Sequence, residues 1–161
     1  MNTAKNIDEA ITSTPSDREI RMERIFNAPR ERVWKAMTDP ELIPQWWGRG
    51  RKLVVERYEF KRGGHWRFVV HDEHGVNGFE GRYREITPPV RAVQTFEWDG
   101  MPGHVIIETV VLEDLGDGRT KLTNTSLFHT TEERDGMLQS GMEQGANDSY
   151  AALDEVLARL G

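Results

Sequence analysis

Side chains able to do acid–base chemistry are few in this sequence and far apart. The candidates are Glu80, Arg82, Glu108 and His129. If they converged inside a barrel of strands, burial could raise the pKa of a carboxyl group into a range useful for catalysis. Glu80 and Arg82 alternate with Phe79, however, so we expect both to face solvent. The sequence has no Gly-x-Ser-x-Gly nucleophile motif and no glycine-rich phosphate-binding pattern, so catalysis stays an open alternative without an assigned catalytic residue.

No set of side chains in the sequence has the spacing that a metal site requires. His71 and His74 lie in what we expect to be an exposed hairpin turn, and so short a turn seldom holds ligands in a preorganised geometry. The other histidines stand alone in the sequence. The absence of cysteine excludes disulfides, thiolate catalysis and cysteine-based metal sites, and it fits a reducing cytoplasm. We expect neither a metal ion nor a cofactor.

Length and charge narrow the class of protein further. The 161 residues suffice for one domain, and a formal net charge of -6 disfavours nucleic acid or an anionic membrane as a partner. No apolar run approaches the roughly 18 residues of a membrane span, and the start lacks the pattern of a signal peptide. We therefore predict a cytoplasmic protein with a flexible tail over residues 1–17 and a single domain over residues 18–161. The sequence does not decide between a monomer and a homodimer.

A tryptophan pair follows two segments that begin with proline. Pro29 and Pro40 stand where helices would start, and an apolar stripe follows Pro29, so we expect two short helices after a first strand. The second segment leads into Trp46 and Trp47. Two adjacent indoles expose too much apolar surface to remain in water. They either anchor a core or wall a cavity, and the sequence leaves both possibilities open.

The rest of the chain changes once from a strand pattern to a helix pattern. Strand-like segments cover residues 53–60, 65–70, 76–86, 90–98, 104–112 and 120–128. From residue 131 to the end, apolar residues recur at steps of three and four, which predicts one long amphipathic helix. Strands in succession with helices at the ends favour an α+β fold, in which only this helix is long enough to cover the sheet.

Two glycines interrupt the apolar stripe of the predicted helix. Gly141 and Gly145 lie four residues apart on one face, and a glycine inside a helix costs about 1 kcal/mol relative to alanine. Two compensations are conceivable: close packing of the helix backbone on a strand, or space for a ligand.

Alternation along the strands assigns aromatic and polar side chains to one inner face. The residues that we expect to line a ligand site are Trp46, Trp47, Trp66, Phe68, Phe79, Phe96, Trp98, Asn124, Ser126, His129 and Met142. The aromatic members could simply fill a core. Inward Asn124 and Ser126 nevertheless favour a wet or liganded cavity, because a buried polar group must be hydrogen-bonded.

The chain also resembles a known superfamily. The matching segments are residues 26–34, 38–41 with Trp46 and Trp47, 81–86 before Pro88 and Pro89, 95–98, 118–123 and 141–145. They are similar to the START-like (SRPBCC, or Bet v 1-like) superfamily, in the branch named for activators of the heat-shock protein 90 ATPase. One departure is that relatives often carry an aromatic residue, commonly Trp, after Gly145, where this chain has Ala146.

The resemblance implies a helix-grip fold, an α+β arrangement in which a curved antiparallel sheet of about seven strands surrounds the C-terminal helix. It also implies a cavity between sheet and helix, and the leading hypothesis is that this cavity binds a hydrophobic small molecule. Two alternatives remain: an interaction module with a chaperone partner, and a cyclase or hydrolase that uses the same cavity. A buried ionisable pair within hydrogen-bond reach would favour the enzyme.

Overall fold

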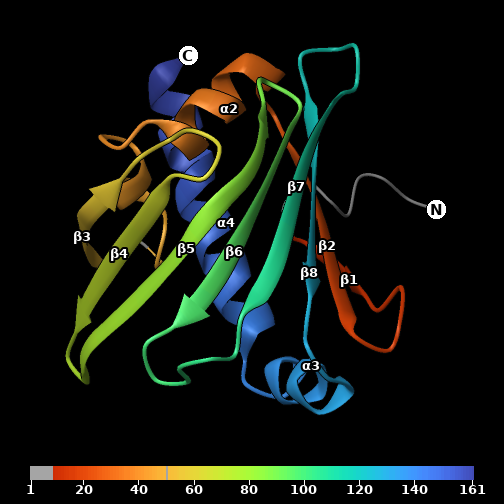
Figure 1. The fold of residues 1–161 in the computed structure, drawn as a ribbon. Helices are drawn as coiled ribbons and strands as arrows, with labels where there is room; N and C mark the ends of the chain where they lie inside the picture. Colours follow the sequence, from red (N-terminus) through yellow and green to blue (C-terminus); the bar gives the residue numbers. More distant parts are fainter. Residues whose placement is uncertain (1–8, 50) are drawn as a thin grey trace.

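One curved antiparallel sheet of eight strands forms the body of the molecule, in the order β1-β2-β8-β7-β6-β5-β4-β3 (Figure 1). We describe it from a computed structural model, over residues 9–49 and 51–161. The strands are β1 (Ile11–Ser13), β2 (Glu19–Phe26), β3 (Lys52–Tyr58), β4 (His65–Asp72), β5 (Gly75–Thr87), β6 (Arg91–Trp98), β7 (Ile106–Asp114) and β8 (Thr120–Leu127). The helices are α2 (Arg30–Thr38), the 3-10 helix η1 (Ile43–Gln45), α3 (Thr131–Leu138) and α4 (Met142–Leu160).

This architecture confirms the predicted α+β helix-grip fold, with one strand more than expected. The additional strand is β1, which lies within the residues that we assigned to a flexible tail and pairs with β2 through Ile11 opposite Glu23. Its start is tied to α4, because the backbone N–H of Ala10 donates to Oδ1 of Asn147 at 2.9 Å. Residues 1–8 of the predicted tail lie outside the described residues.

The helical segments differ from the predicted ones at two places. The element before the tryptophan pair is one turn of 3-10 helix, and the Asp39 side chain accepts the N–H of Glu41 at the turn that precedes it. The single long C-terminal helix is two helices, α3 and α4. They separate at Gly141, whose φ of 84° lies in the left-handed region that glycine adopts without a steric penalty. Gly141 therefore precedes α4 and does not interrupt it.

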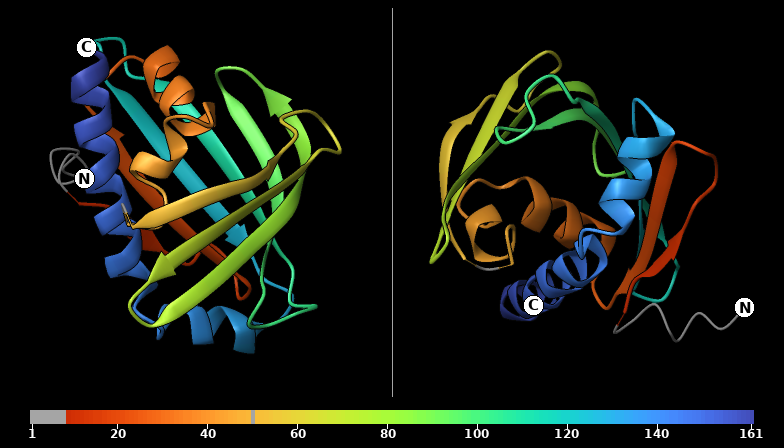
Figure 2. Two further views of the ribbon diagram at one scale, coloured as in Figure 1. Left: turned by 90° about the vertical axis from the view of Figure 1, so that its left-hand side faces the viewer. Right: turned by 90° about the horizontal axis from the view of Figure 1, so that it is seen from below.

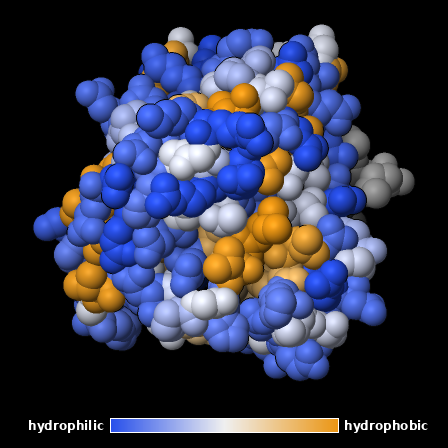
Figure 3. Space-filling model, in the orientation of Figure 1, coloured by the Kyte–Doolittle hydropathy of each residue, from blue (hydrophilic) through white to orange (hydrophobic). Residues whose placement is uncertain are grey.

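The convex face of the sheet is mostly polar (Figure 3). Arg67 on β4 pairs there with Asp99 at 2.7 Å, and its Nη1 lies 3.6 Å from Glu80. The Arg82 side chain is exposed as well. Glu80 and Arg82 therefore contribute nothing to the interior, as their alternation with Phe79 indicated. Among the described residues, no helix is long and apolar enough to cross a membrane.

Two apolar cores lie on the concave face, on which α2, η1 and α4 also lie (Figure 2). The first joins α4 and α2 to β2 and β8, with Phe26 and Leu153 fully buried. The second joins η1 to β3, β4 and β5 around Trp66. Trp47 and Phe96 pack against both cores. The interior is thus divided into two halves that these two aromatic residues bridge.

A partly buried ion pair attaches α4 to the first half of the sheet. The Arg24 guanidinium on β2 donates to both carboxylate oxygens of Asp154 on α4, at 2.9 and 2.6 Å. Arg24 is only 2% exposed, and its Cζ lies 4.7 Å from the centre of the Phe26 ring. Two parallel hydrogen bonds also define the orientation of the helix, which a single point contact would not.

Asp154→Ala is expected to lower the free energy of unfolding by about 2 kcal/mol, because it leaves the buried Arg24 charge without its partner, although the Asp154 side chain itself is 41% exposed. The matched control is Asp117→Ala, which removes the exposed pair between Asp117 and Arg119 and should change the stability by at most about 0.5 kcal/mol. Urea unfolding followed by circular dichroism measures both. Equal losses in the two variants would contradict a structural role for the Arg24–Asp154 pair.

Candidate functional site

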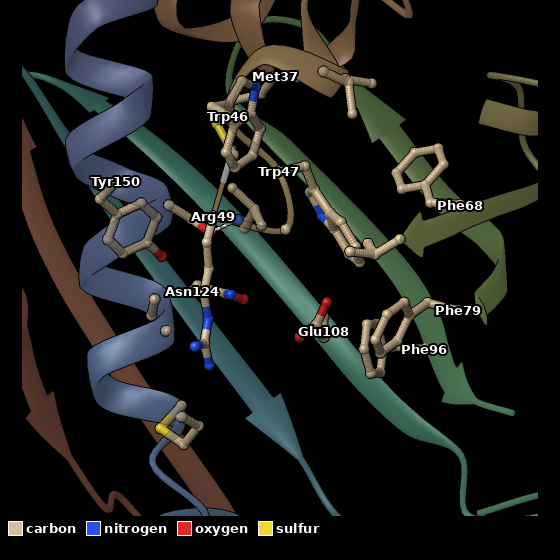
Figure 4. A pocket seen from close by; sticks show the side chains of 18 of the residues that line it. Met37, Trp46, Trp47, Arg49, Phe68, Phe79, Phe96, Glu108, Asn124 and Tyr150 are labelled. Atoms are coloured by element: carbon tan, nitrogen blue, oxygen red, sulfur yellow. Dashed lines mark hydrogen bonds between the residues drawn. The ribbon is translucent and has the colours of Figure 1, made fainter. Parts of the chain in front are cut away.

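A cavity of about 440 Å³ lies between the concave face of the sheet and α4 (Figure 4). Its walls come from α2, η1 and the loop after it, from strands β4 to β8, and from the first half of α4. The volume falls within the range of about 300 to 1,000 Å³ that is usual for small-molecule sites. The division between the two cores leaves this space.

The tryptophan pair serves both of the purposes that the sequence left open. Trp46 is buried in the first core, and its Nε1 donates to the carbonyl oxygen of Ala36 on α2 at 2.9 Å. Trp47 lies edge-on to Phe68 and Phe79, with ring centres 5.2 and 5.3 Å apart. Both indoles also line the cavity. Trp46 therefore anchors the loop, and Trp47 forms a cavity wall.

The structure brings most of the predicted site residues to this cavity. Those that line it are Trp46, Trp47, Phe68, Phe79, Phe96, Asn124 and Met142. They come from the loop after η1, from β4, β5, β6 and β8, and from α4, so the fold collects them from the whole length of the chain. Their role in binding stays a prediction.

The other predicted site residues lie elsewhere. Trp66 has no exposed surface and is enclosed in the second core, with its ring centre 4.9 Å from that of Phe68. Trp98 is 38% exposed, and its Nε1 donates to Asn77. Its indole can cover the following turn because Gly100 has no side chain: a Cβ there would lie 2.3 Å from the ring. His129 follows the end of β8 and is exposed.

A row of polar residues crosses the cavity floor on three adjacent strands. Gln94 on β6 is directly opposite Glu108 on β7, and Glu108 is opposite Ser126 on β8. Gln94 and Glu108 line the cavity, whereas Ser126 donates its hydroxyl to Glu108 at 3.4 Å from outside the lining. The predicted contribution of Ser126 to the site is therefore indirect.

Glu108 is the central residue of this row, and the predicted lining set omitted it. Burial raises the pKa of Glu108 to about 7, and the hydrogen bond from Ser126 acts in the opposite direction. The partial exposure of the side chain is toward the cavity, which it lines. The signal in the sequence was alternation, because Glu108 has the same inward parity as Ile106 and Leu112, both of which are buried.

Asn124 and Tyr150 add polar groups on the side of α4. Oδ1 of Asn124 is buried without a hydrogen-bond partner among the described residues. Tyr150 is buried with its ring edge-on to Phe26, and its hydroxyl end lies toward the cavity (Figure 4). Burial, and to a smaller extent the charge of Glu108, holds the pKa of Tyr150 well above its usual value. The interior therefore has a buried polar atom, Oδ1 of Asn124, that the surrounding described residues leave without a partner.

Gly145 packs against the Arg49 side chain and not against a strand, and its second expected role, space for a ligand, stays a prediction. A Cβ at this position would lie 2.5 Å from Nη2 and 2.8 Å from Nε of Arg49. The glycine thus makes room for the Arg49 guanidinium against the backbone of α4, rather than for a strand. Arg49 and Gly145 both line the cavity, and no local pattern indicates their contact because 95 intervening residues separate them.

Comparisons with known proteins agree with this architecture. The model of the family described as "Activator of Hsp90 ATPase homolog 1-like protein" matches residues 27–158. A search of curated proteins returned no match.

Several solved structures are similar to this one over most of the chain. A protein of Rhodobacter sphaeroides is 29% identical, with a TM-score of 0.86 over 95% of this chain and 100% of its own. A protein of Arthrobacter aurescens is 25% identical, with a TM-score of 0.83 over 92% of this chain and 91% of its own. A protein of Chromobacterium violaceum is 26% identical, with a TM-score of 0.74 over 86% of this chain and 96% of its own.

Glu108→Gln is expected to stabilise the protein at neutral and alkaline pH. The pKa of Glu108 is about 7 in the folded protein and ordinarily 4.5, so the folded protein keeps the proton up to a higher pH than the unfolded chain does. Ionisation of Glu108 therefore lowers the stability progressively between pH 4.5 and 7, by up to about 3 kcal/mol. The gain from Gln should be complete above pH 7 and should vanish below pH 4.5.

Urea unfolding at pH 4, 6 and 8 measures this difference. Glu113→Gln on the same strand is the matched control, because the Glu113 side chain is exposed and should show no comparable pH-dependent gain. Parallel stability–pH curves for Glu108→Gln and the unsubstituted protein would contradict the proposed burial of this carboxyl group.

Proposed function

The chain belongs to the family of Activator of Hsp90 ATPase homolog 1-like proteins, and from that premise we propose that it binds a hydrophobic small molecule in the cavity between the sheet and α4. The aromatic wall of Trp47, Phe79 and Phe96 would contact the apolar body of the ligand. The polar row on the cavity floor would receive a polar group.

The single observation that carries this proposal is the combination of apolar walls with an unsatisfied polar interior. A buried polar atom without a partner costs about 1 to 3 kcal/mol, so Oδ1 of Asn124 favours a bound water or ligand over an empty space. Glu108 lies one strand away, with Val110 of its own strand opposite Asn124. A ligand with a hydrogen-bonding group would satisfy both side chains at once.

Small residues on α4 leave room for such a ligand. Ala146 lines the cavity at the position where relatives often carry an aromatic side chain. With alanine at this position, a volume of about one indole ring is left open. The cavity is therefore expected to accept a larger ligand than it would with an aromatic residue at position 146.

Two other functions have weaker support. An enzyme would need a second ionisable side chain within hydrogen-bond reach of Glu108, whereas the hydrogen bond found among the described residues comes from Ser126. A chaperone-associated role is suggested by the family description alone. Co-purification of a chaperone with the protein from its native host would favour the second of these.

N-Phenyl-1-naphthylamine, a neutral fluorescent probe, is expected to bind the protein at one site. Ala146→Trp should fill the cavity and weaken this binding at least tenfold. Ala151→Trp is the control, because it places the same side chain on the exposed face of the same helix and should leave the affinity within twofold. Circular dichroism verifies that both variants are folded.

Native mass spectrometry of the protein purified from its host provides a second measurement, in which a retained small molecule is expected. Absence of probe binding together with absence of a retained molecule would overturn the proposed function. Equal probe affinity in the two tryptophan variants would place the binding outside this cavity.

A further inference from the structure

We propose that the ligand of this cavity is a monoanionic amphiphile, whose acidic group binds the guanidinium of Arg49 beside Gly145. This inference rests on the proposed function, because it specifies the charge of the molecule that the cavity would take. Three observations support it: the backbone of Arg49, its contact with Gly145 and the distribution of charge in the cavity.

The backbone of Arg49 is held in an uncommon conformation. Its φ is 66°, and among the described residues it is the one non-glycine residue with a positive φ. Such a conformation is sterically unfavourable for a residue with a side chain and persists where the surroundings stabilise it. Here the N–H of Arg49 donates to Oγ of Ser149 on α4 at 3.0 Å. The loop after η1 is thereby attached to the helix at the residue that carries the guanidinium.

The side chain continues along the same helix. Because Gly145 has no Cβ, Nη2 and Nε of Arg49 can lie close to the backbone of α4 within the cavity lining. In the view of Figure 4, the Arg49 side chain runs past Tyr150 and Asn124, and its guanidinium ends beyond them. The left-handed backbone, the Ser149 hydrogen bond and the missing side chain at position 145 all contribute to this one placement. Arg49 as a whole is exposed, so these contacts place its guanidinium at the cavity while leaving it accessible to solvent and to a ligand.

The charges around the cavity leave Arg49 uncompensated. The other cation of the lining, Arg51, pairs with Asp72 at 3.2 Å. Within the described part of the chain, no carboxylate lies within 4.0 Å of the Arg49 guanidinium. Glu108 lines the same cavity without forming an ion pair with Arg49, and burial raises the pKa of Glu108 to about 7. The cavity thus combines an available cation with an acid that can also be neutral.

The chemistry of this arrangement favours an anion over a cation. A guanidinium binds a carboxylate or sulfonate through charge-assisted, often bidentate, hydrogen bonds. A cationic ligand would instead be repelled by Arg49. The aromatic wall of Trp47 and Phe96 excludes a small hydrophilic anion, because burying it there would remove its hydration without an apolar body to compensate. The combination selects an acidic group attached to an apolar body.

Two fluorescent probes that differ by one group test this inference. 8-Anilinonaphthalene-1-sulfonate has the same ring system as N-phenyl-1-naphthylamine, with an added sulfonate. Arg49→Gln is expected to weaken binding of the sulfonate probe by about tenfold or more and to change binding of the neutral probe less than twofold. Arg84→Gln is the matched control, because Arg84 is an exposed arginine outside the cavity lining, and it should leave both affinities within twofold.

Gly145→Ala tests the geometry without removing the charge. Its methyl group would displace the guanidinium, so the sulfonate probe should again bind more weakly, while Arg49→Lys should retain part of the affinity. If the neutral probe binds and Arg49→Gln leaves the affinity for the sulfonate probe unchanged, the proposed anion site is wrong and the hydrophobic binding function stands. If neither probe binds the unsubstituted protein, the proposed anion site is wrong; if native mass spectrometry also finds no retained molecule, both proposals fail.

Discussion

One helix cannot cover the concave face of an eight-stranded sheet, and most features of this molecule follow from that mismatch. Neighbouring strands lie about 4.8 Å apart and a helix with its side chains is about 10 Å wide, so a helix covers two or three strands. The Arg24–Asp154 pair holds α4 over the first half of the sheet, next to β2. The second half is covered by η1 and the loop after it. The cavity is the space that remains between these two coverings.

The same mismatch accounts for both the tryptophan pair and the small residues of α4. Trp46 attaches the η1 loop to α2, and Trp47 reaches across to the second core. Aromatic bulk on α4 would close the remaining space, but this chain has Gly145 and Ala146 there. Packing at full density would stabilise the fold further, because an unfilled apolar space forgoes contacts. Stability is therefore lower than a filled interior would provide, in exchange for a cavity.

The polar row on the cavity floor likewise lowers the stability of the fold. Glu108 lies at an inward position of β7, where an apolar residue would avoid the free-energy cost of burying a carboxyl group. Local rules are usually broken at functional sites, and the unsatisfied Oδ1 of Asn124 lies on the neighbouring strand. Together with Arg49, these residues give the cavity a polar side, opposite an aromatic one.

Local patterns in the sequence determined most of the elements, their order and the inward parity of the predicted strands, because alternation and helical periodicity depend on neighbouring residues alone. They missed β1 and the break between α3 and α4. They also required Trp46 and Trp47 to be buried. Only the tertiary structure decided which inward residues face the cavity: Phe68 does, whereas Trp66, two residues earlier with the same parity, is enclosed in a core. It likewise turned Trp98 outward and brought Arg49 against Gly145. These outcomes depend on sheet curvature and on the path of loops between distant segments, which no local pattern encodes.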